Sequence, residues 1–363
     1  MLRITEYIRE ALQGKEAAVQ QKGVTLIWNL TNICNLRCSH CYSSANQTTE
    51  GMLDMETILN VIPELKKAGV VFAILSGGEP LLRENIFEIS SALKENGIKT
   101  YLSTNGLLIN EQNIDVIKKH FEYVGISIDG EPHIHDEFRG RNGSFAASMK
   151  AIRLCLNHGI RVGLRFTLTK MTYASLPFIF RLVEDERIPK LYISHLVYSG
   201  RADAITDIEK REYLSAVQFI LNKAFYYVEN NLPVDIVTGN NEADAVLLIR
   251  EFDNRYPEMS GRLEGRLRKW GGNQAGVRLV NIDFRGNVKP DPFFSHPIGN
   301  IKDNGFGQIW NSNGILSALR ERPRKIKGKC SECVYLDICN GNSRARSFAV
   351  HEDYLMEDPA CYI

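Results

Sequence analysis

The chain has 363 residues, a formal net charge of +1, and 44% hydrophobic and 24% charged residues. This ordinary globular balance excludes a disordered or fibrous chain. A net charge near zero gives no overall field that would draw the protein to nucleic acid or to an anionic membrane.

The first 22 residues are expected to form an N-terminal helix. Arg3, Glu6, Arg9 and Glu10 lie between apolar positions, which is typical of a short amphipathic helix and not of a signal peptide. No run of the sequence approaches the roughly 18 consecutive apolar residues that span a bilayer. We therefore expect a soluble, cytoplasmic protein.

Residues 23–205 alternate short apolar runs with helical patterns. The expected strands are Val24–Leu30, Val71–Leu75, Lys99–Ser103, Tyr123–Ile128, Arg161–Leu168 and Leu191–Leu196, and the expected helices are Met55–Ala68, Asn85–Asn96, Glu111–His120, Ser144–His158 and Ser175–Glu186. Gly69, Gly97 and Gly159 follow three of these helices, as C-terminal caps do. Alternating βα units predict an α/β fold with a parallel sheet, here a partial (β/α)6 barrel.

The rhythm changes after residue 205. Residues 206–272 are mostly helical in pattern, with a short Val-rich break near Asn231–Asn241, and we expect a helical bridge there. Residues 273–363 begin with two strand-like runs, Val277–Ile282 and Gly286–Lys289, and then become loop-rich. This last part is expected to form a small C-terminal domain.

Seven of the eight cysteines fall into two sets, one directly after the first strand and one near the end of the chain. Because a cytosolic chain keeps its thiols reduced, such sets indicate metal sites and not disulfides. Cys155 stands alone on an expected helix, and a buried apolar role fits it best.

The first set is Cys34, Cys38 and Cys41, spaced CxxxCxxC. Thiolates are the ligands of iron–sulfur clusters, and a tight loop can bring three of them to one cubane. A zinc site is the alternative, but structural zinc is usually held by four ligands. His40 could be the fourth, although its place beside Cys41 would strain that geometry.

This spacing, on the loop after the first strand of a six-unit βα domain, resembles the radical S-adenosylmethionine (SAM) superfamily. The resemblance implies a [4Fe–4S] cluster with one iron open to SAM. A second element agrees, because Ser76-Gly77-Gly78-Glu79-Pro80 ends the second strand. In the superfamily the glycines and the glutamate of this turn bind the methionine part of SAM.

Polar residues also end three later strands, at Asn105, Ser127 and Arg165. The carboxyl ends of parallel strands share one edge of the sheet, where ligands bind. By similarity, Ser127 and its polar neighbours contact the ribose of SAM, and Arg165 meets the SAM carboxylate.

The second set is Cys330, Cys333, Cys339 and Cys361. Four thiolates would also suit zinc, but the surrounding segment is similar to the twitch/SPASM domains of radical SAM enzymes, which implies an auxiliary [4Fe–4S] cluster. The sequence departs from the SPASM domains with two such clusters, because Asp291 and Ser343 stand where cysteines are common. One auxiliary cluster is therefore expected.

Three stretches and the chain ending resemble the NirJ family of haem d1 biosynthesis. They are Val237–Val246, Trp270-Gly271-Gly272-Asn273, Pro290–Phe293 and Glu357–Tyr362. The resemblance implies that a 5′-deoxyadenosyl radical, formed from SAM, removes or modifies propionate side chains of a didecarboxysiroheme-type tetrapyrrole. It also implies an electron donor such as flavodoxin or ferredoxin as a partner.

Three alternatives stay open: the sister enzyme of the alternative haem pathway, a SPASM peptide maturase and a two-cluster electron carrier. The short segment before the first strand disfavours the maturase, and the Gly77–Glu79 turn disfavours the carrier. A tetrapyrrole would need cations for its carboxylates and a ligand for its iron. Candidates are Arg201 and Arg278 for the carboxylates, and His195 and His296 for the iron.

Overall fold

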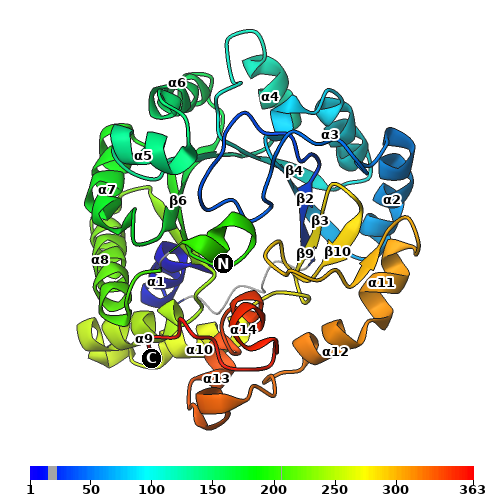
Figure 1. Cartoon of the computed structure of the whole chain (residues 1–363). Coiled ribbons are helices and arrows are strands. Elements are labelled where there is room, and N and C mark those ends of the chain that lie inside the picture. Colours follow the sequence, from blue (N-terminus) through cyan, green and yellow to red (C-terminus); the bar gives the residue numbers. More distant parts are fainter. Residues whose placement is uncertain (15–22, 206) are drawn as a thin grey trace.

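The computed structural model describes residues 1–14, 23–205 and 207–363, and within them one mixed sheet of eleven strands forms the centre of the molecule. The strand order is β1-β8-β7-β6-β5-β4-β3-β2-β9-β10-β11. Strands β2 to β8 and β9 run parallel, and β1, β10 and β11 are antiparallel to their neighbours. The sheet curves inside a ring of helices (Figure 1).

The six strands expected from the apolar runs are confirmed within one or two residues. They are β2 (Val24–Asn29), β3 (Val70–Ser76), β4 (Lys99–Thr104), β5 (Val124–Ser127), β6 (Val162–Leu168) and β7 (Lys190–His195). The expected helices between them are α2 (Met55–Lys67), α3 (Ile86–Glu95), α4 (Ile114–His120), α6 (Ser144–Asn157) and α7 (Leu176–Asp185). Gly69, Gly97 and Gly159 have φ of +87°, +69° and +68°, the left-handed conformation expected of caps.

The sheet is larger than the six strands expected. Strand β8 (Asp235–Gly239) lies in the Val-rich break of the helical region and pairs parallel with β7. Around it are α8 (Lys210–Glu229), α9 (Asp244–Arg255) and α10 (Arg262–Trp270). At the N-terminus, β1 (Leu2–Arg3) pairs with β8 and leads into α1 (Ile4–Leu12), while the remainder of the expected N-terminal helix, residues 15–22, lies outside the described residues.

The C-terminal region continues the same sheet. Strand β9 (Leu279–Ile282) runs parallel to β2, with Thr25 opposite Leu279 and Trp28 opposite Ile282, and β10 (Asn287–Lys289) and β11 (Gly299–Asn300) follow as an antiparallel edge. In Figure 1, α11 (Phe306–Ser312), α12 (Gly314–Arg320) and α13 (Leu336–Cys339) complete the ring, and α14 (Arg344–His351) lies inside it. The C-terminal region is therefore hydrogen-bonded to the first strand of the barrel.

One large apolar core lies between the sheet and its helices and includes the fully buried Trp28 and Phe166. Among the described residues, no helix is both long enough and apolar enough to cross a membrane. All the parallel strands end at the same edge, and the segment after β2, which holds the first cysteine set, starts there.

Candidate functional site

The first cysteine set lies in the loop that leaves the carboxyl end of β2. Cys34 and Cys38 are buried, Cys41 is half-buried, and all three belong to a small apolar cluster with Leu36 and Ala45. The Leu36 N–H donates to Cys34 Sγ and the Ala45 N–H to Cys41 Sγ, each at 3.4 Å. Three thiols in one loop, two of which already accept backbone N–H groups, suit an iron–sulfur cluster.

Burial works against thiolates in this loop. It raises the pKa of Cys34 to about 12, and it also raises the pKa of Cys38. Since thiolates are the metal-binding form, these side chains need a positively charged partner to ionise. Bound iron would supply that charge.

Gly77 and Gly78 hold the end of β3 against the start of this loop. Gly78 N–H donates to Thr31 O at 2.7 Å, and Glu79 N–H donates to Ile33 O at 2.8 Å. A Cβ at Gly77 would lie 2.5 Å from Thr31 O, and one at Gly78 would lie 2.2 Å from Ile33 O. The glycines therefore permit a close backbone contact with the cysteine loop, in addition to the approach to SAM that the sequence predicts.

Glu79 is fully buried at the same edge. Its Oε1 accepts from Thr104 Oγ1 at 2.7 Å and from Leu81 N–H at 3.2 Å, and its Oε2 accepts from Asn105 N–H at 2.9 Å. Burial raises the pKa of Glu79. The carboxylate is therefore held rigidly by three donors, which leaves part of its acceptor capacity for a ligand.

Asn105 and Ser127 also lie at the carboxyl ends of their strands, β4 and β5, whereas Arg165 lies in the middle of β6. Asn105 Nδ2 donates to Asn35 Oδ1 at 2.7 Å, so the loop after β4 is tied to the cysteine loop. Ser127 and Arg165 are paired across β5 and β6, and the Arg165 guanidinium lies 4.8 Å from the Tyr192 ring centre. The fold thus brings Asn105 and Ser127 to the same edge of the sheet as the first cysteine set.

Helix α5 (Pro132–Arg139), which the sequence analysis missed, also contacts the cysteine loop. Arg37 N–H donates to Arg139 O at 3.2 Å, and Ser39 N–H donates to Phe138 O at 3.0 Å. Pro132 at the start and Gly140 after the end are the sequence signals that would have predicted this helix.

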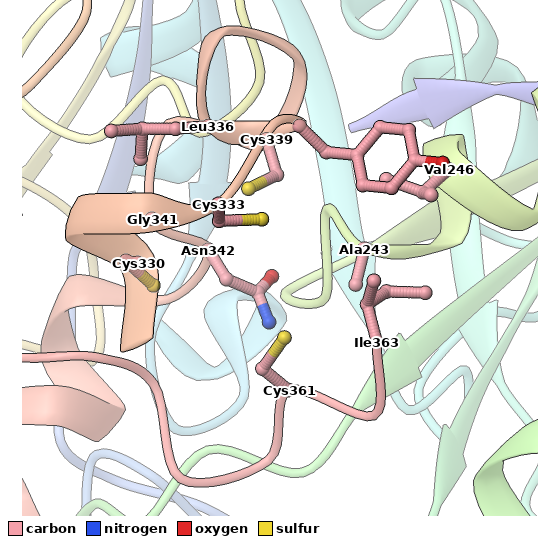
Figure 2. A pocket seen from close by; sticks show the side chains of 11 residues that line it. Ala243, Val246, Cys330, Cys333, Leu336, Cys339, Gly341, Asn342, Cys361 and Ile363 are labelled. Atoms are coloured by element: carbon pink, nitrogen blue, oxygen red, sulfur yellow. The ribbon is translucent and has the colours of Figure 1, made fainter. Parts of the chain in front are cut away.

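The second cysteine set lines a pocket of about 350 Å³, part of which is open to solvent. Figure 2 shows the four side chains, from the segment around α13 and from the chain ending, around this pocket with Val246, Leu336 and Ile363. Burial raises the pKa of Cys330 to about 11 and that of Cys339 to about 12.

The lining of this pocket suits an iron–sulfur cluster. Four cysteines surround an apolar space. Four soft ligands around such a space suit a group with several irons.

Asp291 and Ser343 stand at the two positions where further cysteines are common, and both have structural contacts. Asp291 Oδ1 accepts from Phe293 N–H at 2.8 Å, and Ser343 Oγ accepts from Arg346 N–H at the start of α14.

His195 and Arg278, both predicted to bind a tetrapyrrole, do not lie beside the cysteine loop at an open surface. His195 is buried, and its Nε2 lies 2.9 Å from Asp244 Oδ2. Asp244 also accepts a hydrogen bond from the Tyr362 hydroxyl, so His195 supports the segment that carries Cys361 and is not open to a substrate. Arg278 precedes β9, and its carbonyl accepts from Thr25 N–H, so it lies at the amino ends of the strands, opposite the cysteine loop.

Arg201 binds the cysteine loop itself. Its Nε donates to Cys38 O at 2.8 Å and its Nη1 donates to Ala45 O at 2.9 Å, while its N–H donates to Cys41 O at 3.0 Å. The side chain predicted to pair with a substrate carboxylate therefore positions two of the predicted cluster ligands.

His296 is exposed. Its ring lies 5.0 Å from that of Phe348 on α14, and its Nδ1 is 3.0 Å from Ser295 Oγ. Phe293, in the same connection between β10 and β11, lies 5.1 Å from the ring of Tyr42, which follows Cys41. This connection thus carries aromatic rings and a histidine beside the cysteine loop.

Two families match the chain, one in the region that holds the first cysteine set and one in a region that includes Cys330 and Cys333 of the second. Residues 28–183 match the radical SAM superfamily, and residues 274–334 match SPASM, an iron–sulfur cluster-binding domain. These domains support SAM and two [4Fe–4S] clusters as the cofactors.

Relatives match over nearly the whole chain. The pre-heme d1 synthase of Dinoroseobacter shibae is 38% identical, over 93% of this chain and 86% of its own. The Fe-coproporphyrin III synthase of Methanosarcina barkeri is 34% identical, over 95% of this chain and 89% of its own.

Solved structures share the fold. Streptococcus suis SuiB bound to S-adenosylmethionine aligns over 94% of this chain and 77% of its own, with a TM-score of 0.72 and 17% identity. The assignment to a family is based on the sequence matches. The chain belongs to the radical SAM enzymes with a SPASM domain, in the family that includes pre-heme d1 synthase and Fe-coproporphyrin III synthase.

Proposed function

We propose that this enzyme acts on an iron tetrapyrrole of the didecarboxysiroheme type and removes or modifies its propionate side chains. The observation that carries the proposal is the 38% identity with a pre-heme d1 synthase over 93% of the chain. When bound, SAM and the first cluster supply a 5′-deoxyadenosyl radical, which can take a hydrogen atom from an otherwise inert carbon.

The chain's own residues would bind and shield the reacting groups. Cys34, Cys38 and Cys41 would hold the first cluster. The second cluster would lie in the pocket of Cys330, Cys333, Cys339 and Cys361. The turn Gly77-Gly78-Glu79, with Asn105, Ser127 and Arg165, would hold SAM beside the first cluster.

The connection between β10 and β11 supports a flat, iron-containing substrate. Phe293 offers an aromatic ring beside Tyr42, and the exposed His296 offers a ring nitrogen, a usual haem-iron ligand. We propose His296 as the iron ligand. This proposal leaves out the other three predicted substrate residues. Arg201 is held by three hydrogen bonds to the cysteine loop, Arg278 is distant from that loop, and His195 is buried.

The stretch that resembles the NirJ family supports the proposal through its contacts. Asn241, between β8 and α9, donates to Ala360 O at 3.2 Å, beside the ligand Cys361, and its Oδ1 accepts from Asn342 Nδ2 at 2.6 Å. Ala243 and Val246 of the same stretch line the auxiliary pocket in Figure 2, and Asn241 holds Asn342, which also lines it. The stretch that resembles the NirJ family thus lies beside the second cluster site. This placement supports a role of the second cluster in the reaction of the substrate.

A second candidate is the reaction of the Fe-coproporphyrin III synthases, because one of them is 34% identical over 95% of this chain. To separate the two, the anaerobic, reconstituted enzyme is incubated with SAM, a reductant and didecarboxysiroheme, and the tetrapyrrole is followed by mass spectrometry. A mass loss from the propionates supports the first candidate. A product with intact propionates and other side chains changed supports the second.

The control is the enzyme with Cys34, Cys38 and Cys41 replaced by Ala, which should leave the tetrapyrrole unchanged. A peptide arm is run in parallel. If the tetrapyrrole is untouched and its spectrum is unaffected, while a peptide accelerates SAM cleavage, the enzyme is a peptide maturase and the proposal is wrong.

A further inference from the structure

Helix α5 ends directly against the loop of the first cysteine set. The carbonyls of Phe138 and Arg139, in its last turn, accept from the N–H groups of Ser39 and Arg37. Gly140 follows with φ of +69°, and a Cβ there would lie 2.8 Å from Arg37 O. The helix terminus is thus fixed on the loop around Cys38, and its carbonyls place partial negative charge there.

The Arg139 side chain reaches back to Cys38 itself. Its Nη1 donates to Cys38 Sγ at 3.7 Å, and its side chain is only 10% exposed. A guanidinium is always charged, so a cation lies in contact with a predicted cluster ligand and is poorly screened by water.

Asp129 fixes that cation in place. Arg139 Nε donates to Asp129 Oδ2 at 2.7 Å, and Nη2 contacts the same oxygen. Asp129 is held in turn, because Oδ1 accepts from Thr167 N–H at 2.8 Å and its own N–H donates to His135 Nδ1 at 3.0 Å. The orientation of Arg139 toward Cys38 is therefore set by the ends of β5 and β6, independently of any substrate.

We propose that Arg139 is a positioning residue that raises the reduction potential of the first cluster through Cys38, and that Asp129 limits this rise. Hydrogen bonds to the sulfurs and nearby charge are among the main determinants of cluster potentials. Reduction adds one negative charge to the cluster, so a fixed cation beside a ligand stabilises the reduced state, and a fixed anion destabilises it.

The proposal predicts opposite signs for two substitutions. In Arg139→Gln the cation is lost, and the equilibrium constant for one-electron reduction should fall about tenfold, a potential lower by about 59 mV. In Asp129→Asn the opposing anion is lost, and the potential should rise. Loss of packing alone would give no reason for opposite shifts.

The experiment is a potentiometric titration of the reconstituted holoenzyme, followed by electron paramagnetic resonance in the presence and absence of SAM. SAM identifies the signal of the first cluster, and the second cluster in the same sample is an internal reference whose potential should not move. Arg266→Gln is the matched control, because Arg266 is a buried arginine paired with Glu10, away from the cysteine loop.

An unchanged first-cluster potential in Arg139→Gln, or shifts of the same sign in both variants, would overturn the proposal. If Arg139→Gln does not retain the first cluster, the Asp129→Asn variant alone decides, because the proposal requires the potential of its first cluster to rise. If neither retains the cluster, the wild-type enzyme with ¹⁵N-labelled arginine decides. Electron–nuclear double resonance of its reduced first cluster should detect a coupled arginine nitrogen, and the absence of that coupling refutes the contact.

Discussion

Asp291 is a buried carboxyl whose ionisation should destabilise the enzyme at neutral pH. Burial raises its pKa to about 6 from 3.8, the nearby Glu242 adds to the rise, and Lys289 opposes it. Since each pKa unit corresponds to about 1.4 kcal/mol, ionising Asp291 costs the folded state about 3 kcal/mol. Asn at this position can keep the two backbone hydrogen bonds that Oδ1 accepts from Phe293 and Phe294.

Asp291→Asn should therefore stabilise the enzyme at pH 7.5 by up to about 3 kcal/mol. A folded-state pKa above the unfolded value means that stability is present at low pH and is lost as pH rises from about 4 through about 6. The gain in the variant should thus fall to about half at pH 5. At about 2 °C per kcal/mol for a large domain, the thermal midpoint should rise by about 6 °C at pH 7.5.

The assay is thermal unfolding of the anaerobic holoenzyme by circular dichroism at the two pH values. Asp136→Asn is the contrasting control: although burial opposes its ionisation, N–H groups of Phe145 and Gly143 lower the pKa of Asp136, so this variant should lose stability. A gain for Asp291→Asn that is equal at pH 5 and pH 7.5, or a loss at pH 7.5, would refute the reasoning.

Four further predictions concern the two cluster sites and the substrate. Iron analysis should find about eight irons per chain, and replacing the three cysteines of the first set with Ala should leave about four and abolish SAM cleavage. Glu79→Gln should leave the buried Asn105 N–H without its carboxylate acceptor, which lowers the free energy of unfolding by about 1–3 kcal/mol. The same variant should bind SAM more weakly in calorimetry. A melting curve and a SAM affinity like those of the wild type would mean that the turn is misassigned. Arg201→Ala should reduce the iron content of the first cluster and spare the second, because Arg201 holds the backbone of Cys38 and Ala45; equal losses from both clusters would contradict this. His296→Ala should alter the Soret shift of added tetrapyrrole, whereas His195→Ala should leave it and lower stability, and the opposite pattern would reassign the iron ligand.

The periodic part of the barrel was readable from the sequence because its strands are continuous apolar runs. Strand β3, for example, is apolar at every position from Val70 to Leu75, as in strands covered on both faces, and capping glycines follow the helices between the strands. The cysteine spacing was equally informative, since the chemistry of the ligands is contained in the loop itself.

The missed features depend on partners that are distant along the chain. Strand β8 is five residues long and β1 only two, so each is defined by its pairing more than by its own pattern. Arg201 was assigned to a substrate carboxylate because an arginine beyond a strand gives no indication of its partner. Its partners are backbone carbonyls more than 150 residues away, which no local pattern contains.

The pairing of β9 with β2 has a consequence for synthesis of the chain. The strand that covers the outer edge of β2 is made about 250 residues after β2 itself, with Thr25 opposite Leu279. Until then the nascent barrel exposes an unpaired, apolar edge, the kind of template on which chains associate wrongly. Closure of this edge waits for β9, so a strand made about 250 residues later protects the first strand of the barrel.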